Sequence, residues 1–247
     1  MKPKIKLYNG DCIEIMKKLI SSKIKVNAII TDLPYGVTSE SWDKIIPIDQ
    51  MWDCIKQIRK DNAAILLFGN EPFSSYLRIS NVKEYRYDLY WQKERPTNIF
   101  QLNRRAGKVI EIINVFYAKQ PVYNPQKTVY NGHRRTNKVG MGKFSSLIDN
   151  GNKKPFEYKD DGTRFPLQII KFKRDILTSN LHPTQKPVEL MEYLIKTYTN
   201  EGDTVLDFCM GAGSTGVACK NLNRNFIGIE INSDFFKISR KRLKSIQ

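Results

Sequence analysis

Residues 203–216 read DTVLDFCMGAGSTG, an apolar stretch that ends in an acid and runs directly into a glycine-rich loop. The apolar part predicts a buried strand over 203–208. The residues TGVACKNL (215–222) predict a helix directly after the loop. A strand, a glycine loop and a helix in this order are typical of α/β proteins that bind nucleotides at the carboxyl ends of their strands.

The loop itself carries the pattern GxGxxG, formed by Gly211, Gly213 and Gly216. Such glycines permit a tight turn and let a ligand approach the backbone closely. Glu230 follows 19 residues after Gly211, at the end of the predicted strand 224–231, where a carboxylate binds ribose hydroxyls. The pattern favours a nucleotide site, and the alternative is a purely structural turn.

The position of the loop near the end of the sequence constrains the topology. Only 31 residues follow Gly216, too few to complete a nucleotide-binding sheet. The remaining strands must come from the N-terminal half, so we expect KIKLY (4–8) to continue the sheet beside 224–231. This predicts a circularly permuted Rossmann-like sheet, and it makes a nicotinamide enzyme a poor fit.

The N-terminal half supplies suitable elements. Apolar runs and helical spacing alternate along it, which predicts a mainly parallel sheet with helices on both faces. The expected strands are 4–8, 25–32, 62–69, 85–93 and 109–119, and the expected helices are 12–20, 46–60, 187–199 and 234–246.

Acidic residues end several of these strands: Asp11, Asp32, Asp207 and Glu230. Ligands of open α/β sheets bind outside the carboxyl ends of the strands. Four acids on one rim suit a cationic ligand that carries a ribose and a base better than they suit a pyrophosphate.

The positive charge is concentrated in the middle of the chain. Residues 93–186 carry 19 Lys and Arg against 7 Asp and Glu, which accounts for +12 of the net charge of +16. The segment also contains many Phe and Tyr residues, so a disordered basic linker is the less favoured alternative. A concentrated positive charge favours a surface that binds a polyanion, and nucleic acid is the commonest one.

Other features exclude several classes of protein. The chain has 247 residues, and its apolar runs are too short to cross a bilayer. Basic residues at the N-terminus precede no apolar stretch, so we expect no secretory signal and a cytoplasmic protein. Four scattered cysteines form no CxxC pair, so we expect neither a zinc site nor a disulfide framework. We also expect no other metal site.

Taken together, the chain resembles the S-adenosylmethionine-dependent DNA amino-methyltransferases of the permuted type, in which the catalytic tetrapeptide precedes the cofactor loop. The resemblance covers most of the ordered chain. It rests on the stretches TDLPYG (31–36), LFGNEPF (67–73), YWQK (90–93), HPTQKPVELMEYLI (182–195), DFCMGAGSTG (207–216) and NFIGIEIN (225–232).

The resemblance implies roles for individual residues. It implies a catalytic half over 1–119, a basic target-recognition insertion over 120–180 and a cofactor-binding half over 181–247. The residues implied in binding S-adenosylmethionine are Asp11, Cys12, Thr184, Lys186, Asp207, Gly211, Gly213, Glu230 and Ile231. The candidate DNA contacts are Arg104, Arg105, Arg134 and Arg135. Turn, capping or solvated roles are the alternatives for these residues.

The tetrapeptide of Asp32, Leu33, Pro34 and Tyr35 would hold the target base. An exocyclic amine is a weak nucleophile, and two acceptors on its N–H bonds favour attack on the methyl group. The Asp32 carboxylate and the Leu33 carbonyl would accept, Pro34 would stiffen the loop, and Tyr35 would stack on the base. Leu33 departs from the family's usual proline, which leaves the loop less rigid.

The resemblance implies methylation of adenine N6 in a specific sequence of double-stranded DNA, with the base flipped out of the duplex. Asp at the first tetrapeptide position favours adenine. The alternatives are cytosine N4 methylation, methylation of RNA or of a protein glutamine, and a catalytically silent DNA-binding relative. A homodimer, a separate restriction endonuclease and a bacterial or phage-infected cell are compatible settings.

Overall fold

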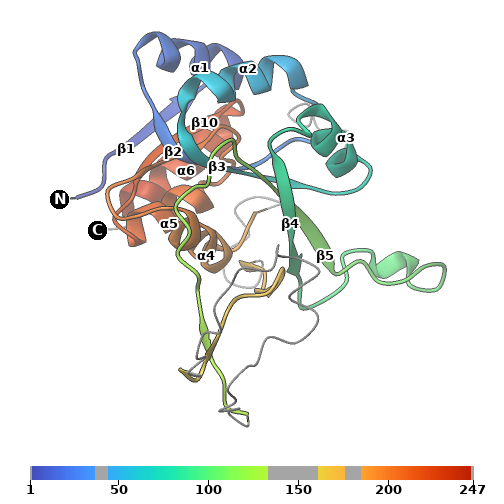
Figure 1. Ribbon diagram of the computed structural model, residues 1–247. Coiled ribbons are helices and arrows are strands. Elements are labelled where there is room, and N and C mark those ends of the chain that lie inside the picture. The colour runs from blue at the N-terminus through green and yellow to red at the C-terminus, as the bar shows by residue number, and fades with distance from the viewer. Residues whose placement is uncertain (1, 37–43, 133–160, 176–184, 246–247) are drawn as a thin grey trace. The chain divides into compact units, whose positions relative to one another are not determined.

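The computed structural model describes residues 2–36, 44–132, 161–175 and 185–245. The chain divides into two compact units. Unit 1 comprises Met1–Asn124 with Leu167–Gln247, and unit 2 comprises Pro125–Pro166. Within the described residues, unit 1 contains one sheet of eight strands, and its helices lie on both faces of that sheet (Figure 1).

The elements of unit 1 follow the predicted alternation of strands and helices. The strands are β1 (Ile5–Asn9), β2 (Val26–Asp32), β3 (Arg59–Gly69), β4 (Tyr85–Gln92), β5 (Ile110–Phe116), β8 (Ile169–Lys171), β9 (Thr204–Asp207) and β10 (Asn225–Glu230). The helices are α1 (Cys12–Ser21), α2 (Ile48–Ile58), α3 (Phe73–Ser80), α4 (Val188–Tyr198), α5 (Ser214–Asn221) and α6 (Ser233–Ser245), with a 3-10 turn η1 (Ile99–Gln101).

The order of the strands confirms the permuted topology. The sheet runs β1-β10-β9-β2-β3-β5-β4-β8, and β1 pairs in parallel with β10, with Ile5 opposite Phe226. The Asn9 side chain donates to the carbonyl of Glu230, 221 residues away in the sequence, at 2.8 Å. The N-terminal strand therefore completes the sheet that the glycine loop begins.

Two apolar clusters explain why helices cover both faces. α1, α2 and α3 pack on one face through residues such as Met16, Ile55 and Leu77. α4 and α5 pack on the other face through residues such as Leu194 and Ala218, and α6 joins them. Strands β2 and β3 lie between the two clusters, so their side chains are buried on both sides, as expected for central parallel strands.

Four features differ from the sequence-based expectation. β5 is antiparallel to both of its neighbours, β3 and β4. α3 was not predicted because it is short and contains three serines, and the three-residue β8 was not predicted within the basic segment. α2 ends at Ile58 rather than at residue 60, and Arg59 begins β3, with its guanidinium paired to Glu84 at 2.6 Å.

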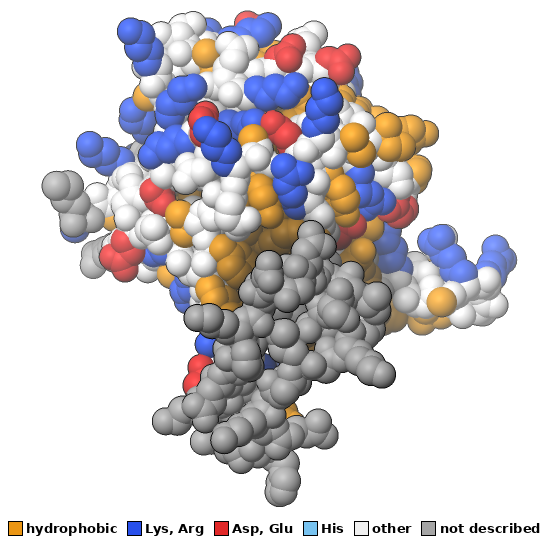
Figure 2. Space-filling model, in the orientation of Figure 1, with side chains coloured by type: hydrophobic (Ala, Val, Ile, Leu, Met, Phe, Trp, Pro, Cys, Tyr) orange, Lys and Arg blue, Asp and Glu red, His pale blue; other side chains and the backbone are white. Residues whose placement is uncertain are grey.

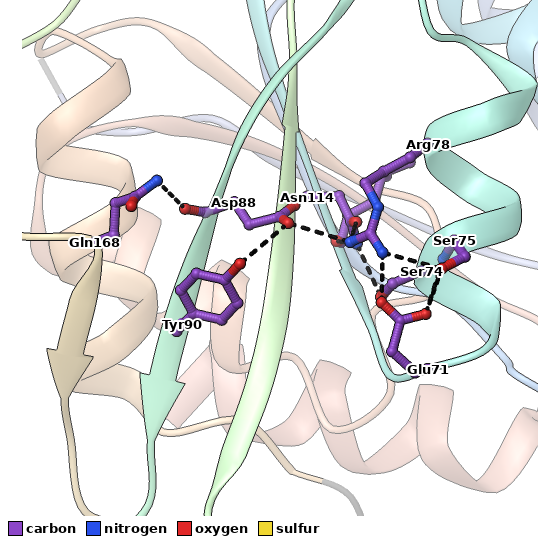
Figure 3. A network of polar contacts seen from close by, with 9 residues as sticks. Glu71, Ser74, Ser75, Arg78, Asp88, Tyr90, Asn114 and Gln168 are labelled. Atoms are coloured by element: carbon purple, nitrogen blue, oxygen red, sulfur yellow. Dashed lines mark hydrogen bonds and ion pairs between the residues drawn. The ribbon is translucent and has the colours of Figure 1, made fainter.

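A polar network fixes α3 on the antiparallel end of the sheet (Figure 3). The Arg78 guanidinium of α3 pairs with Asp88 of β4 at 3.1 Å and also with Glu71. The Asn114 side chain of β5 donates to the Leu67 carbonyl at 3.0 Å. Burial raises the pKa of Asp88 although Arg78 opposes this. The network therefore ties β4 and β5 firmly to the rest of unit 1.

The described part of unit 2 is a short antiparallel pair, β6 (Thr128–Val129) with β7 (Thr163–Arg164). The Arg164 guanidinium lies over the Tyr130 ring, 3.9 Å from its centroid. Unit 2 falls within the predicted insertion 120–180, whereas β8 belongs to the sheet of unit 1. No helix in the described ranges is long and apolar enough to span a membrane.

Candidate active site

A cavity of about 610 Å³ opens at the carboxyl ends of the parallel strands of unit 1. The four acids that the sequence places at strand ends, Asp11, Asp32, Asp207 and Glu230, all line it. Parallel strands end on the same edge of a sheet, which brings residues from both halves of the sequence together. The cavity has two chemically different ends, called here the loop end (Asp207, Gly211, Glu230) and the transfer end (Asp32, Glu111, Lys186).

At the loop end, backbone amides hold the Glu230 carboxylate. Gly211 N donates to Oε2 and Asn232 N donates to Oε1, both at 2.8 Å. Gly211 has a φ of +50°, a conformation that glycine adopts without strain. Burial raises the pKa of Glu230 although the backbone donors oppose this. Each oxygen keeps a lone pair with which it can accept a ligand hydroxyl.

Asp207 is almost fully buried, and protein donors occupy its carboxylate. The hydroxyls of Thr31 and Thr215 donate to it at 2.8 and 2.5 Å, and Cys209 N donates at 3.1 Å. Burial raises the pKa of Asp207 to about 6. These bonds connect β9, β2 and α5, so the carboxylate holds the glycine loop in place in addition to lining the cavity.

Gly213 was predicted to bind the cofactor, and that role stays a prediction. Of the loop glycines, Gly211 lines the cavity and Gly213 does not. Gly213 begins α5 with a φ of +77°, and a Cβ there would lie 3.0 Å from Ser239 Cβ of α6. Glycine at this position therefore also serves the turn and the close packing of α6.

The start of α1 closes the loop end. Asp11 caps the helix by accepting from Glu14 N at 3.0 Å, so the capping alternative is realised while the residue also lines the cavity. Cys12 is buried beside it, and Ile231 is 57% exposed. Ile231 lines the cavity, as does Phe235 of α6, which was not predicted.

At the transfer end, Asp32 follows the buried strand β2. Its Oδ1 accepts from the Tyr35 hydroxyl at 2.5 Å, and its Oδ2 accepts from Lys186 Nζ. The Tyr35 ring lies against Phe73, with centroids 5.2 Å apart. The Leu33 side chain is buried in the apolar core and so anchors the tetrapeptide. Pro34 lines the cavity.

Lys186 and two unpredicted residues complete a chain of alternating charges. Lys186 was predicted to bind the cofactor, which stays a prediction; in the structure its ammonium bridges Asp32 and Glu111, 3.0 Å from Glu111 Oε1. Glu111 Oε2 also pairs with Lys93 at 2.6 Å. The charged Glu111 within the apolar strand VIEIINVF was the sequence signal for this site.

The pKa shifts of Asp32, Lys186 and Glu111 follow from burial and from these alternating charges. Burial raises the pKa of Asp32, and the nearby Lys186 opposes that shift. Burial also disfavours the charge on Lys186, but the carboxylates of Asp32 and Glu111 outweigh it and raise its pKa. Glu111 is buried as well, yet Lys186 and Lys93 lower its pKa. The cation therefore stays charged beside Asp32 and favours a carboxylate that accepts hydrogen bonds.

Other predicted residues lie elsewhere. Arg104 and Arg105 are exposed on the segment between β4 and β5, outside the cavity. Thr184, Arg134 and Arg135 lie outside the described residues. The roles assigned to all of these residues remain predictions.

The cavity suits S-adenosylmethionine on chemical grounds. The loop end offers the fixed Glu230 carboxylate for ribose hydroxyls, beside the apolar Ile231 and Phe235 for a base. The Gly211 backbone leaves room for close approach. Acids around the cavity complement a positively charged ligand.

Comparisons with known proteins agree with this chemistry. Residues 26–241 match the N6_N4_Mtase family, described as DNA methylase. The DNA adenine methyltransferase YhdJ of Escherichia coli (strain K12) is 26% identical, with 96% of this chain and 82% of that protein covered. The type II methyltransferase M.HpaI of Haemophilus parainfluenzae is also 26% identical, with coverage of 97% and 74%.

Solved structures share the fold. The M1.HpyAVI–SAM complex is 29% identical with a TM-score of 0.66, covering 97% of this chain and 100% of that one. The cytosine-N4-specific PvuII DNA methyltransferase has a TM-score of 0.66 at 14% identity, covering 100% and 91% of the two chains, and supports the fold alone. Because the family model matches most of this chain, the chain belongs to the S-adenosylmethionine-dependent DNA methylases.

Proposed function

We propose that this enzyme methylates the N6 amine of adenine within a specific sequence of double-stranded DNA. The observation that carries the proposal is the position of Asp32 on the cavity, with its carboxylate oriented by Tyr35 and Lys186. Bound S-adenosylmethionine supplies an electrophilic methyl group. Glu230 would accept from its ribose hydroxyls, and Asp11, Cys12 and Ile231 would hold its base.

Asp32 and Leu33 act on the target amine. The amine lone pair is delocalised into the ring, and attack requires the nitrogen to become tetrahedral. The Asp32 carboxylate and the Leu33 carbonyl accept its two N–H bonds and stabilise the positive charge that develops. Each Asp32 oxygen already accepts one protein donor and retains a further lone pair for the amine.

Adenine is favoured over cytosine by two observations. The first tetrapeptide residue is Asp32, and YhdJ, which aligns over 96% of this chain, is named an adenine methyltransferase. Cytosine N4 remains the second candidate, because its amine presents the same geometry to the same acceptors.

The target base must leave the duplex to reach the cavity, which costs a few kcal/mol of unstacking and unpairing. Phosphate contacts from the basic segment 93–186 offset that cost. We assign target recognition to the segment 120–180, between a catalytic half over 1–119 and a cofactor-binding half over 181–247. Arg104, Arg105, Arg134 and Arg135 are the proposed DNA contacts.

The test is methyl transfer from labelled S-adenosylmethionine to unmethylated DNA, followed by mass spectrometry of the digested nucleosides. N6-methyladenine is the expected product, and sequencing of the product then gives the site. N4-methylcytosine would overturn the choice of base and keep the mechanism. Cofactor binding without any DNA product would move the assignment to RNA, a protein glutamine or a silent DNA binder.

The biological setting follows from the substrate. We infer action on DNA in the cytoplasm of a bacterial or phage-infected cell. M.HpaI is named a type II methyltransferase, so a separate restriction endonuclease is the expected partner, and a homodimer is a further prediction. Measurement of the molecular mass of the pure enzyme in solution tests the homodimer.

A further inference from the structure

An exposed apolar tip stands on the segment between β4 and β5, called here the rim excursion (residues 94–108). Ile99, Phe100 and Leu102 are 60%, 100% and 48% exposed. Figure 1 shows that the excursion projects from the ends of the two strands, and Figure 2 shows apolar and basic side chains gathered on it. Adjacent large apolar side chains left in water usually mark a surface that meets a partner.

The rim excursion is a folded element. Thr97 N donates to the Lys108 carbonyl at 3.0 Å, which joins the outgoing and returning segments of the excursion at its base. The Asn98 side chain donates to the Ala106 carbonyl at 3.0 Å and accepts from Lys108 N at 2.6 Å. η1 then presents Phe100 at the tip. These bonds fix the direction of the tip relative to β4 and β5.

The base of the excursion lies on the rim of the cavity. Thr97 and Lys108 line the cavity, as does Lys93 at the end of β4. Lys93 pairs with Glu111, which belongs to the transfer end. The apolar tip is therefore carried by the same wall that receives the target base.

The charges around the tip identify the partner. Arg95, Arg104, Arg105 and Lys108 lie in the excursion, and its one acidic residue, Glu94, pairs with Arg174 at 2.9 Å. Cations beside an apolar tip complement a duplex, which has phosphates outside and stacked bases inside. The net charge of +16 disfavours a second copy of this chain as the occupant.

We propose that the rim excursion is a DNA wedge, an inference that rests on the proposed function. Phe100 enters the base stack at the place that the flipped nucleotide vacates, while Arg104 and Arg105 contact the flanking phosphates. Apolar side chains inserted between bases stabilise unstacked DNA in other protein–DNA complexes. The wedge keeps the target base in the cavity by filling the gap to which it would return.

The test compares two duplexes that contain the sequence methylated by the wild-type enzyme. One has the target base paired, and the other has an abasic site opposite it, so that flipping is already easy. Phe100→Ala is expected to lower kcat/KM roughly 10- to 100-fold on the paired duplex and much less on the abasic one. Phe100→Trp, which keeps apolar bulk, is expected to restore most of the activity.

Tyr76→Ala is the matched control, because Tyr76 is an exposed aromatic residue on α3, 63% exposed. It should leave both rates unchanged. All variants should keep the wild-type melting temperature and affinity for S-adenosylmethionine, since Phe100 is fully exposed.

The outcomes separate the two proposals. A wild-type enzyme for which no methylated DNA sequence can be found, and for which these duplexes therefore cannot be built, would overturn the proposed function and the wedge together. If the wild type is active, two results with Phe100→Ala overturn the wedge alone. One is a kcat/KM equal to that of the wild type on the paired duplex, and the other is the same fold loss of kcat/KM on both duplexes. A wild-type dimer that Phe100→Ala converts to a monomer would assign the tip to a second copy and also overturn it.

Discussion

The two ends of the cavity hold their carboxylates by different means. At the loop end, Asp207 and Glu230 accept hydrogen bonds from neutral donors, namely backbone amides and threonine hydroxyls. At the transfer end, Asp32 and Glu111 share the ammonium of Lys186. Neutral donors fix a carboxylate without a counter-charge, whereas an ammonium supplies one. The difference suggests that the loop end binds and the transfer end controls charge during the reaction.

Removal of the cation shared by Asp32 and Glu111 should have the largest effect on the transfer end. Lys186→Met leaves Asp32 without its counter-ion and leaves the buried Glu111 paired with Lys93 alone, so we expect the free energy of unfolding in urea to fall by about 3–5 kcal/mol. Lys237→Met is the control, because its pair with Asp234 is exposed, and it should cost less than about 1 kcal/mol. Equal losses in the two variants would contradict a charge-coupled transfer end.

Asp32→Ala should separate transfer from binding. We expect the single-turnover rate of methyl transfer to fall roughly 10²- to 10³-fold, because an acceptor for the developing charge is lost. Affinity for S-adenosylmethionine, measured by calorimetry, should stay within about twofold, since the loop end is intact. Asp61→Ala, which removes an exposed partner of Lys119, is the control and should change neither quantity. Near wild-type turnover by Asp32→Ala would refute the assignment.

Glu230→Ala should give the opposite result. Loss of a charged acceptor is expected to weaken affinity for S-adenosylmethionine roughly 10- to 100-fold. The single-turnover rate at saturating cofactor should change little, because the transfer end keeps its contacts. A melting curve checks that the glycine loop remains folded, and a variant that binds normally but transfers slowly would reverse the comparison.

Glu111→Gln should have the smallest effect, a shift in the pH profile. Asp32 must be ionised to accept, and its raised pKa predicts that kcat falls on acidification above the usual carboxylate range. Glu111 contributes to that rise by charge repulsion. Its removal should therefore lower the pKa of Asp32 and move the acid limb to lower pH. A shift to higher pH would contradict the arrangement.

The same comparison explains what the sequence could predict. The loop end depends on local pattern, since Asp207, Gly211 and Glu230 stand at a strand end, in a loop and at the next strand end. The permuted sheet followed from the short stretch after Gly216, and the pairing of β1 with β10 confirms it. Parallel strands make such inferences reliable because their carboxyl ends meet at one edge.

The transfer end could not be predicted fully from the sequence. Asp32, Glu111 and Lys186 come from three distant segments, and only the antiparallel placement of β5 brings Glu111 to the cavity. The sequence pattern assigned Gly213 to the ligand alone, and its close packing against α6 became visible only in the folded chain. The role of the rim excursion could not be predicted from the sequence either, because the exposure of Phe100 is a property of the folded chain.

The most direct test that the two ends of the cavity act separately is a double-mutant cycle on kcat/KM for S-adenosylmethionine, with Asp32→Ala, Glu230→Ala and the double variant. The two free-energy losses should add within about 0.5 kcal/mol, because the two residues share no partner among the described contacts and perform separate tasks. A coupling energy well above about 1 kcal/mol would contradict it and show that binding and transfer are one function of the whole cavity.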